Sequence, residues 1–352
     1  MGVNEYSDLT YEEVIDSLTG DIRDLTGDIS DLMGANETDV TGGLRFAETW
    51  YTPKDVGKEP KFMDYVKEGA VNPIRHQGAC GSCWAFSAIA SIESQIFIQK
   101  GKLIQLSEQY LVDCSKGVGF PNEPGRTGCE GGWKNNAIRY VSNNGIAYSA
   151  NYPYTAKGGT CNQGAQKTLY RIKGMQRVRP GKDSEQMNAL VHRGPIAVSM
   201  FISENFHEYK KGIFEDNKCQ GAARTHHAMA LVGYGEENGK KYWLIRNSWG
   251  ESWGWNGYMK LCREINNHCL ISIRPYIPVL EVPCSGGVII GGQCLVFSQE
   301  ALNWGQAKTA CENRDQTLAS LINPKAVLDY VKATYGNETF LLGGSDAAKE
   351  GE

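Results

Sequence analysis

The sequence predicts an α+β protein made of two subdomains with a cleft between them. The strongest helical pattern, with apolar residues recurring every three to four positions over Cys83–Lys100, lies in the first half of the chain. Strand-like runs gather after Pro195 instead. Helices followed by strands, and not alternating with them, are typical of α+β proteins. The length of 352 residues favours roughly two domains.

Composition narrows the class of protein. Lys and Arg number 36 and Asp and Glu 40, so the net charge of −4 forces no large basic surface, and nucleic acid is not an expected partner. Apolar residues make up 41% of the chain, enough for buried cores and too many for wholesale disorder. The apolar stretch Ile196–Ile202 is far shorter than the ~20 residues of a membrane span. The cysteines number 11, an odd count, so at least one lacks a partner within the chain.

Helices are expected at several positions of the first half. In the acidic, Gly-rich segment 1–57, four apolar residues between Ile22 and Leu32 could line a short helix, but glycines weaken it. Trp84, Ala88, Ile92 and Ile96 form the stripe of the main helix, which Gly101 ends. Further helices are predicted at 107–113 with Ser107 as the cap, at 134–143, and from Asp183, which resembles a capping box with Gln186, to about 194.

Strands and a separate tail follow. The strand-like runs cover residues 195–202, 228–235, 241–249 and 257–262. A third block begins near Pro283, where residues 294–298 read as a strand and Ser298 can cap a helix that carries Trp304 and Cys311. Residues 324–335 read as a second helix of this block.

The segment Gln77–Phe86, QGACGSCWAF, contains the best candidate for chemistry. Its Cys-x-x-Cys pair could be a redox pair, half a zinc site, or a nucleophile beside a structural half-cystine. A zinc site needs about four ligands, and the sequence has no second such pair. A redox pair is expected after a strand of a βαβ unit. Cys83 opens the strongest helix, whose positive N-terminal end stabilises a thiolate. A buried or disulfide-bonded cysteine stays an alternative on this motif alone.

Three motifs in order resemble the papain-like cysteine proteases, close to the cathepsin L branch. CGSCW is followed by THHAMALVGYG, which supplies His227, and by RNSWGESWGWNGY, which supplies Asn247. The resemblance implies a papain-like fold with a helical left half and a β-barrel-like right half. It also implies a cysteine endopeptidase that needs no cofactor and no metal. The segment between Cys114 and Cys129 has no histidine cluster of the kind that makes one branch of the family a carboxydipeptidase.

The resemblance assigns roles to the catalytic residues. Cys83 is the nucleophile that forms an acyl-enzyme, and His227 is the base and acid. Asn247 orients the imidazole, and Gln77 donates to the oxyanion beside the backbone N–H of Cys83. Trp249 shields the contact between Asn247 and His227; alternatively it is an ordinary core tryptophan. His226 is expected at the rim of the cleft, and the other four histidines are expected at the surface, at positions 76, 192, 207 and 268.

The substrate pocket also follows from the resemblance. Gly131 and Gly132 allow the peptide backbone to approach closely. Residues expected to line the pocket for the second residue before the cut are Trp133, Ser199, Thr225 and Ala228. Its floor falls on Arg274, where the family more often has a small or an acidic residue. We expect Arg274 to favour acidic or polar substrate residues, unless it extends to water or pairs with a carboxylate such as Glu264.

The resemblance gives most cysteines a partner. The peptidase pairs are Cys80–Cys129, Cys114–Cys161 and Cys219–Cys269, and Cys284–Cys294 belongs to the tail. Cys83 is the thiol nucleophile. Cys311 is expected to bond a part of the tail domain that this chain lacks, and Cys262 has no evident mate.

Two flanking segments resemble other known parts. GVNEYSD, Gly2–Asp8, is similar to a motif near the end of the family's inhibitory prosegment, so cleavage is expected around 57–61. Cys284 and Cys294, followed by CLVFSQEALNWGQAKTACENRDQTLASL, make residues 283–352 resemble the first half of a C-type lectin-like domain. The domains are therefore expected at 1–57, a prosegment remnant, 58–282, the peptidase, and 283–352, the lectin-like part. Sugar binding is not expected, since the half with the usual calcium and sugar ligands is absent.

The expected setting is lysosomal or extracellular, because this many cysteines favour an oxidising compartment although no signal peptide is recognised. The chain is expected to act as a monomer on protein or peptide substrates, with its own prosegment as inhibitor. The rival hypothesis is a non-catalytic recognition protein in which the lectin-like part binds and the peptidase part is a scaffold. The complete set of Gln77, Cys83, His227 and Asn247 argues against that rival.

Overall fold

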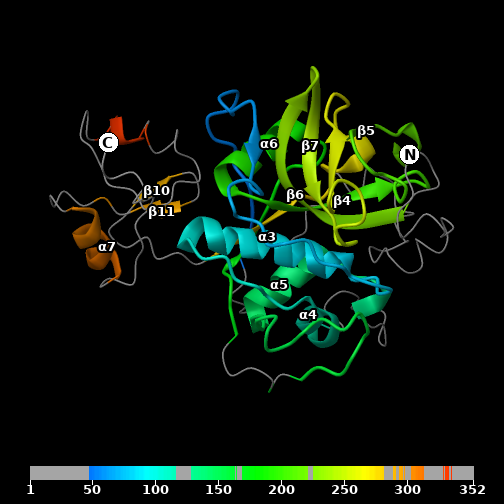
Figure 1. Cartoon of the computed structure of the whole chain (residues 1–352), viewed down its shortest axis with the longest axis horizontal. Coiled ribbons are helices and arrows are strands. Elements are labelled where there is room, and N and C mark those ends of the chain that lie inside the picture. Colours follow the sequence, from blue (N-terminus) through cyan, green and yellow to red (C-terminus); the bar gives the residue numbers. More distant parts are fainter. Residues whose placement is uncertain are drawn as a thin grey trace. The chain divides into compact units, whose positions relative to one another are not determined.

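The computed structural model describes residues 47–115, 128–162, 164, 169–220, 225–280, 288–290, 293–295, 297, 303–312, 328, 330–332 and 334 (Figure 1). Its Cα positions divide the chain into two compact units: Met1–Gln95 with Leu103–Glu281, and Ile96–Lys102 with Val282–Glu352. Within the described ranges, no helix has both the length and the apolar character needed to cross a bilayer.

Helix α3 (Cys83–Lys100) has the bounds that its apolar periodicity predicted. From Cys83 to Gln95 every residue is buried, so the helix is enclosed on all sides and not only along the predicted stripe. Its buried hydroxyls are paired: Ser87 Oγ donates to the carbonyl of Met229 at 2.6 Å, and Ser91 Oγ to that of Ala88 at 2.9 Å. Figure 1 shows α3 running between the sheet and helices α4 and α5. This interior helix carries Cys83 at its first position.

Three further helices belong to the larger unit: α4 (Glu108–Cys114), α5 (Lys134–Asn144) and α6 (Asp183–Arg193). Ser107 caps α4 as predicted, since its hydroxyl accepts from the backbone N–H of Tyr110 at 2.9 Å. The capping box predicted for α6 is wrong. The N-cap of α6 is Lys182, and the carboxylate of Asp183 instead accepts from Ser272 Oγ and from the backbone N–H of Asn267. Short 3₁₀ turns lie at Gly128–Glu130, Asn217–Gln220 and His268–Leu270.

The strands of this unit form one sheet in the order β1-β3-β9-β4-β6-β7-β8-β5, with β2 paired to β6. The bounds are β1 (Ala47–Trp50), β2 (Met63–Asp64), β3 (Gly174–Arg177), β4 (Ile196–Ile202), β5 (Ile213–Phe214), β6 (Thr225–Glu237), β7 (Lys240–Arg246), β8 (Tyr258–Cys262) and β9 (Tyr276–Val279). The four predicted strand segments correspond to β4, β6, β7 and β8. All seven residues of β4 are buried, which explains its continuous apolar sequence.

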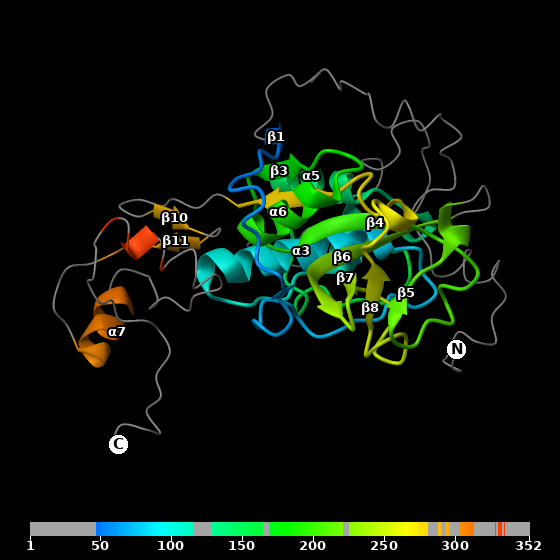
Figure 2. The ribbon, with the colours of Figure 1, turned by 90° about the horizontal axis from the view of Figure 1, so that it is seen from above.

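The sheet differs from the barrel-like arrangement that was expected. Its path of hydrogen-bonded neighbours runs from β1 to β5 without closing, as far as the described strands show. The edge at β1 comes from the segment that precedes the expected cleavage region, because Ala47–Trp50 pairs in parallel with Gly174–Arg177 (Figure 2). Sequence patterns did not reveal this strand, since its four residues show no clear alternation.

Three disulfides stabilise the larger unit: Cys80–Cys129, Cys114–Cys161 and Cys219–Cys269. These are the three pairs that the resemblance implied for the peptidase. Each closes a loop of about fifty residues, which typically contributes roughly 2–4 kcal/mol by restricting the unfolded chain. Cys83 and Cys262 are buried and form no disulfide among the described residues.

The smaller unit contains a two-stranded hairpin, β10 (Val288–Ile290) with β11 (Gln293–Leu295), and helix α7 (Trp304–Glu312). The helix begins later than the predicted cap, Ser298, which lies outside the described residues. Asn303 is the cap instead: its Oδ1 accepts from the N–H of Gln306, whose Oε1 accepts from the N–H of Asn303. The described residues within 324–335, at 328, 330–332 and 334, are helical. Cys284, the prosegment motif Gly2–Asp8 and the helix considered between Ile22 and Leu32 lie outside the described residues.

Candidate active site

Cys83 is the first residue of helix α3, directly after the loop that contains Cys80. The loop before it is held by the Cys80–Cys129 disulfide and by a hydrogen bond from the N–H of Gly81 to the carbonyl of Cys129, 2.8 Å. The side chain of Cys83 is fully buried, and its Sγ accepts from the backbone N–H of Ala228 at 3.5 Å. Ala228 directly follows His227 on β6, so the thiol from the helical half meets the strand that carries the histidine.

His227 and Asn247 form the second part of the site. The imidazole Nε2 lies 2.7 Å from Asn247 Oδ1, and both side chains are buried. An amide oxygen only accepts, so Nε2 carries the hydrogen in this contact. Nδ1 is therefore the ring nitrogen that can take a proton from the thiol. Asn247 follows the last residue of β7, Arg246, whose strand pairs with β6.

Aromatic rings enclose the histidine. The ring of Trp249 lies 4.8 Å from that of His227, and Phe206 lies 5.9 Å away. Trp253 packs against both Trp249 and Phe206, at 5.6 and 5.0 Å. Trp249 is fully buried. The contact between His227 and Asn247 is thus separated from water by a packed cluster, which strengthens its electrostatics.

Gln77 is fixed from several sides. Its Nε2 donates to the carbonyl of Cys80 at 2.9 Å, and its Oε1 accepts from Ser248 Oγ at 2.6 Å. Its backbone N–H donates to the carbonyl of Ser248 at 2.8 Å. Ser248 in turn donates its N–H to Asn247 Oδ1 at 2.8 Å. Ser248 therefore links Gln77 to Asn247, a role that sequence reasoning missed; its only signal is its position directly after Asn247.

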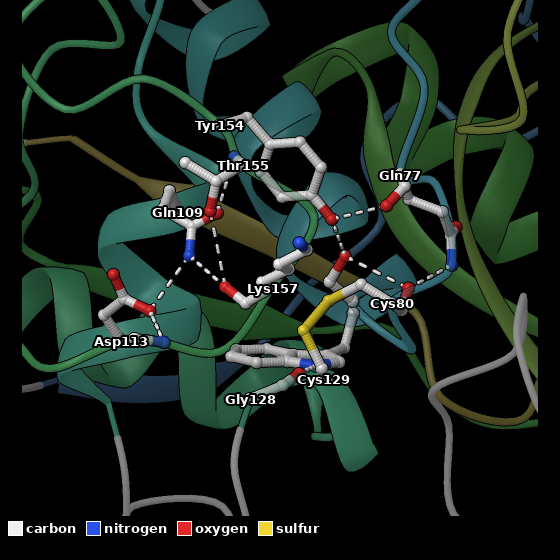
Figure 3. Close-up of a disulfide and its surroundings, with 12 residues drawn as sticks. Gln77, Cys80, Gln109, Asp113, Gly128, Cys129, Tyr154, Thr155 and Lys157 are labelled. Carbon is white, nitrogen blue, oxygen red and sulfur yellow. Dashed lines mark hydrogen bonds between the residues drawn. A yellow bond between two sulfur atoms is a disulfide. The ribbon is translucent and has the colours of Figure 1, made fainter.

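Figure 3 shows how the loop around the disulfide is supported. Tyr154 donates its hydroxyl to the carbonyl of Gln77 at 2.7 Å, and it lies 2.6 Å from Ser82 Oγ. Burial raises the pKa of Tyr154 well above its usual range, so the hydroxyl stays a donor. Gln109 on α4 bonds the backbone of Thr155 and Lys157 on the same loop. Tyr154 thereby holds the segment that carries Gln77 and Ser82, and Gln109 holds the segment that carries Tyr154.

A buried ionic network joins α3 to α4 through Arg75. Arg75 bonds Glu93 on α3 at 2.9 Å and Glu108 on α4 at 2.5 Å. Asn72 Nδ2 also donates to Glu93, at 2.8 Å, and Arg246 donates to the carbonyl of Pro73 at 2.6 Å. Burial raises the pKa of Glu93 and lowers that of Arg246. The network fixes α3 against α4 and the end of β7, and so fixes Cys83 relative to Asn247.

Gly131 and Gly132, the two residues expected to approach the substrate backbone, are glycines for steric reasons. Gly131 has φ +111°, a conformation that side chains disfavour. A Cβ on Gly132 would lie 2.5 Å from the indole of Trp84, which is closer than real contacts allow. The indole of Trp84 is itself held by a hydrogen bond to the carbonyl of Gly128 at 3.1 Å. Both positions therefore require glycine.

The predicted pocket residues are partly brought together. Ser199 on β4 lies directly opposite Ala228 on β6 in the register of the sheet. Thr225 begins β6 opposite Ile202, and its side chain lies outside what the structure describes. The guanidinium of Arg274 lies over the ring of Trp133, 4.8 Å from its centroid. Glu264, the carboxylate suggested as a partner of Arg274, accepts a hydrogen bond from the backbone N–H of Lys241.

Sequence reasoning missed Lys134, the residue after Trp133. Its side chain is 1% exposed, and its Nζ donates to Ser199 Oγ at 2.5 Å. The ammonium also lies over the ring of Tyr276, at 5.6 Å. A buried lysine beside a pocket residue was not expected, because the pattern of the predicted helix marked this position only as its start.

The expectation that the remaining histidines lie at the surface or at the rim of the cleft is wrong for three of them. His76 is exposed and His192 is half-buried, but His207 and His268 are buried, not at the surface. His226 is also buried, with its ring 3.9 Å from that of Phe201, so it is not a rim residue. Aromatic neighbours and backbone donors in the fold, which no local pattern encodes, bury these rings.

Metal binding receives no support from the described residues. One cluster there combines metal-ligating side chains within reach of one another: Cys219, His268 and Cys269. The two sulfur atoms are bonded to each other in a disulfide. They are therefore not thiolates, and a single imidazole does not make a site.

The chain is similar to known proteins in sequence. Residues 59–279 match the family model described as "Papain family cysteine protease". Cathepsin Q of Rattus norvegicus is 37% identical over 291 residues, which cover 80% of this chain and 78% of that protein. Cathepsin L2 of Homo sapiens is 41% identical over 225 residues, covering 62% of this chain and 65% of that one.

Solved structures show the same likeness. A recombinant stem bromelain precursor aligns with a TM-score of 0.65 and 35% identity, covering 80% of this chain and 83% of that one. The proform of the ragweed pollen allergen Amb a 11, a cysteine protease, aligns with a TM-score of 0.65 and 30% identity, covering 80% and 82%.

Proposed function

The chain belongs to the papain family of cysteine proteases and is a cysteine endopeptidase, and on that premise we propose that Cys83 is its nucleophile and His227 its general base and acid. The observation that carries the proposal is the contact of Cys83 Sγ with the N–H of Ala228 beside a histidine bonded to Asn247. A thiol, an imidazole and an orienting amide in this order form a catalytic triad.

The reaction follows from these contacts. His227 takes the thiol proton at Nδ1, and the thiolate of Cys83 attacks the peptide carbonyl to form an acyl-enzyme. The imidazolium then protonates the leaving amine, and the neutral ring activates the water that releases the acid product. Asn247 keeps the ring in one orientation and one tautomer throughout, since its Oδ1 accepts only from Nε2–H.

The oxyanion of each tetrahedral intermediate needs two donors. The backbone N–H of Cys83 lies at the start of α3, where helical N–H groups have no partner within the helix. The second donor is the side chain of Gln77, whose amide nitrogen carries two donor hydrogens. Ser248, by holding Gln77 Oε1, fixes which end of the amide is the donor.

The substrate lies along Gly131 and Gly132 and bonds them main chain to main chain. The second substrate residue before the cut occupies the pocket lined by Trp133, Ser199, Thr225 and Ala228. Arg274 at its floor shifts the preference towards acidic or polar residues. This assignment is supported by the register that joins Ser199 to Ala228 and by the stacking of Arg274 on Trp133.

Domain organisation is part of the proposal. Residues 1–57 are the remnant of an inhibitory prosegment, 58–282 the peptidase, and 283–352 the first half of a C-type lectin-like domain. The hairpin β10–β11 followed by α7 is compatible with that lectin-like start, and β1 keeps part of the prosegment at the edge of the peptidase sheet. The protein acts as a monomer in a lysosomal or extracellular setting, where its disulfides persist.

Activity of the whole chain on a peptide library, with Cys83→Ala as control, tests the catalytic assignment. We expect cleavage by the wild type, none by Cys83→Ala, and a covalent adduct of a thiol-directed epoxide at Cys83. Undiminished cleavage by Cys83→Ala would refute the assignment. No cleavage and no adduct would favour the rival, a recognition protein with a scaffold peptidase. Sequencing the new N-terminus after activation tests the boundary, which is expected at 57–61.

A further inference from the structure

The hydroxyl of Tyr154 joins the two segments that supply the proposed oxyanion donors. It donates to the carbonyl of Gln77 at 2.7 Å (Figure 3), and it lies 2.6 Å from Ser82 Oγ. Gln77 carries the side-chain donor, and Ser82 directly precedes Cys83, whose backbone N–H is the other donor. That N–H belongs to the planar peptide group between Ser82 and Cys83, so the position of Ser82 decides where it points. One hydroxyl therefore contacts both halves of the oxyanion site.

The direction of these hydrogen bonds follows from the donors that are present. A phenol has one hydrogen and a carbonyl oxygen only accepts, so the hydrogen of Tyr154 is used in the bond to Gln77. Ser82 then donates its own hydrogen to Tyr154 Oη across the 2.6 Å contact. The contact of Ser82 Oγ with the carbonyl of Cys80 is longer, 3.4 Å, and therefore weaker. The bonds run from Ser82 through Tyr154 to Gln77, and bonds in such a chain strengthen one another.

Ser82 uses its hydroxyl in an unusual way for its position. It directly precedes the first residue of α3, and its carbonyl accepts from the N–H groups of Ala85 and Phe86 at 2.8 and 3.3 Å. A serine at the start of a helix usually accepts from an N–H of the first turn through its hydroxyl. The described contacts of this hydroxyl are instead with Tyr154 and the carbonyl of Cys80. Departures from such local rules are typical of functional positions.

Tyr154 is itself held in place, as a residue that positions others must be. Its ring packs edge-on against Phe86 of α3, with the ring centroids 4.9 Å apart. The segment that carries Tyr154 also lies directly against the loop of Gln77. A Cβ on Gly78 would come within 2.9 Å of the Cβ of Ala156, closer than real contacts allow. The hydroxyl is therefore fixed relative to both segments that it bonds.

We propose, on the basis of the oxyanion donors assigned above, that Tyr154 is a positioning residue for both of them. It keeps the side-chain amide of Gln77 and the backbone N–H of Cys83 aligned on the oxyanion. Such donors act only within hydrogen-bond distance of the charge that develops in the transition state, so a small displacement reduces catalysis. The oxyanion does not exist in the bound substrate, so substrate binding does not depend on Tyr154.

Tyr154→Phe removes the hydroxyl and keeps the ring that packs on Phe86. We expect kcat for a peptide substrate to fall about tenfold while KM stays within about twofold of the wild-type value, the pattern of an interaction made only in the transition state. Alkylation of Cys83 by iodoacetamide is attack on a saturated carbon and forms no oxyanion, so its rate should be unchanged. A purely structural role of Tyr154 would instead slow cleavage and alkylation together.

Tyr152→Phe is the matched control. Tyr152 lies two residues earlier, is 9% exposed, and donates its hydroxyl to Asp113 Oδ2 at 2.9 Å. This variant therefore loses a hydroxyl bond on the same segment, but not one to Gln77 or Ser82. It should lower the midpoint of thermal unfolding about as much as Tyr154→Phe does and keep the wild-type kcat.

A double-mutant cycle with Gln77→Ala identifies the group through which Tyr154 acts. When the side chain of Gln77 is absent, only the N–H of Cys83 is left for Tyr154 to align. Tyr154→Phe should then lower kcat by no more than about threefold, against about tenfold in the wild-type background. The same factor in both backgrounds would show that Tyr154 acts independently of Gln77 and would refute the inference.

Two further results would overturn it: an unchanged kcat in Tyr154→Phe, or an equal loss of kcat in Tyr152→Phe. A wild-type kcat in Gln77→Ala would remove the donor that Tyr154 is inferred to align, and would refute the inference while leaving the assignment of Cys83 intact. Failure of the proposed function looks different, because the wild type then cleaves no peptide or Cys83→Ala cleaves as well as the wild type. That outcome would refute the catalytic assignment and this inference together.

Discussion

Replacing Asn247 by alanine tests the orienting contact of the proposed triad. The side chain of Asn247 is 1% exposed, and its Oδ1 accepts from two buried donors, His227 Nε2 at 2.7 Å and the N–H of Ser248 at 2.8 Å. Each buried donor left without a partner costs about 1–3 kcal/mol. Water that fills the space of the lost side chain offsets part of this, so we expect the free energy of unfolding to fall by about 2–4 kcal/mol.

Catalysis should suffer separately from stability. Without Oδ1 the imidazole of His227 is no longer held in the tautomer that leaves Nδ1 for the thiol. We expect kcat/KM to fall about ten- to a hundredfold, which corresponds to roughly 1.4–2.8 kcal/mol of lost transition-state stabilisation. The assay is peptide cleavage well below the unfolding midpoint of the variant, together with urea unfolding.

Asn188→Ala provides the matched control. Asn188 is equally buried and makes a comparable set of bonds, including Tyr51 Oη at 2.7 Å and the backbone N–H and carbonyl of Lys54 at 3.0 and 2.6 Å. It should lose stability by a similar amount and keep its kcat/KM. The reasoning is refuted if Asn247→Ala retains kcat/KM within about twofold, or if both variants lose activity equally.

Three further variants probe other parts of the molecule. Gly132→Ala should reduce stability by about 1–3 kcal/mol and impair cleavage, because its Cβ would meet the indole of Trp84 at 2.5 Å; unchanged unfolding would contradict this. Gln77→Ala should lower kcat about 10²–10³-fold through loss of an oxyanion donor, measured under saturating substrate, and an effect confined to KM would argue otherwise. Burial lowers the pKa of His268 below 6.5, where its Nε2 accepts from the N–H of Asp216. Its contribution to stability is therefore present above pH 6.5 and lost as the pH falls through the lowered pKa, by at most about 1.4 kcal/mol per pH unit. His268→Gln should make the free energy of unfolding depend less on pH below 6.5. Wild type and variant with the same dependence on pH would exclude this role.

Much of the fold was predictable because it depends on local patterns. The bounds of α3 follow from its apolar periodicity and from Gly101, and the Ser107 cap from its hydroxyl. The β1 strand and the open sheet were not predictable, because they depend on pairing between segments far apart in sequence. Asp183 resembles a cap but bonds Ser272 and Asn267, partners that only the folded chain brings near.

In the candidate site, too, some residues follow from local motifs and others only from contacts between distant segments. Cys83, His227 and Asn247 could be proposed from the sequence because their motifs follow one another in a recognisable order, and the structure brings them together. Ser248 and Lys134 carry no motif, and their roles come from hydrogen bonds to Gln77 and Ser199 across the fold. The burial of a charged side chain such as Lys134 depends on packing and not on spacing along the sequence.

The pairing of the Cys83 thiol with His227 is the central claim, and the pH dependence of Cys83 alkylation by iodoacetamide tests it most directly. An ordinary thiol, with a pKa of about 8.5, is almost entirely protonated at pH 6. In the wild-type chain we expect rapid alkylation of Cys83 that persists to pH 6 and below, and His227→Ala should abolish this acidic reactivity. Alkylation that rises only near pH 8.5 in both proteins would contradict the claim.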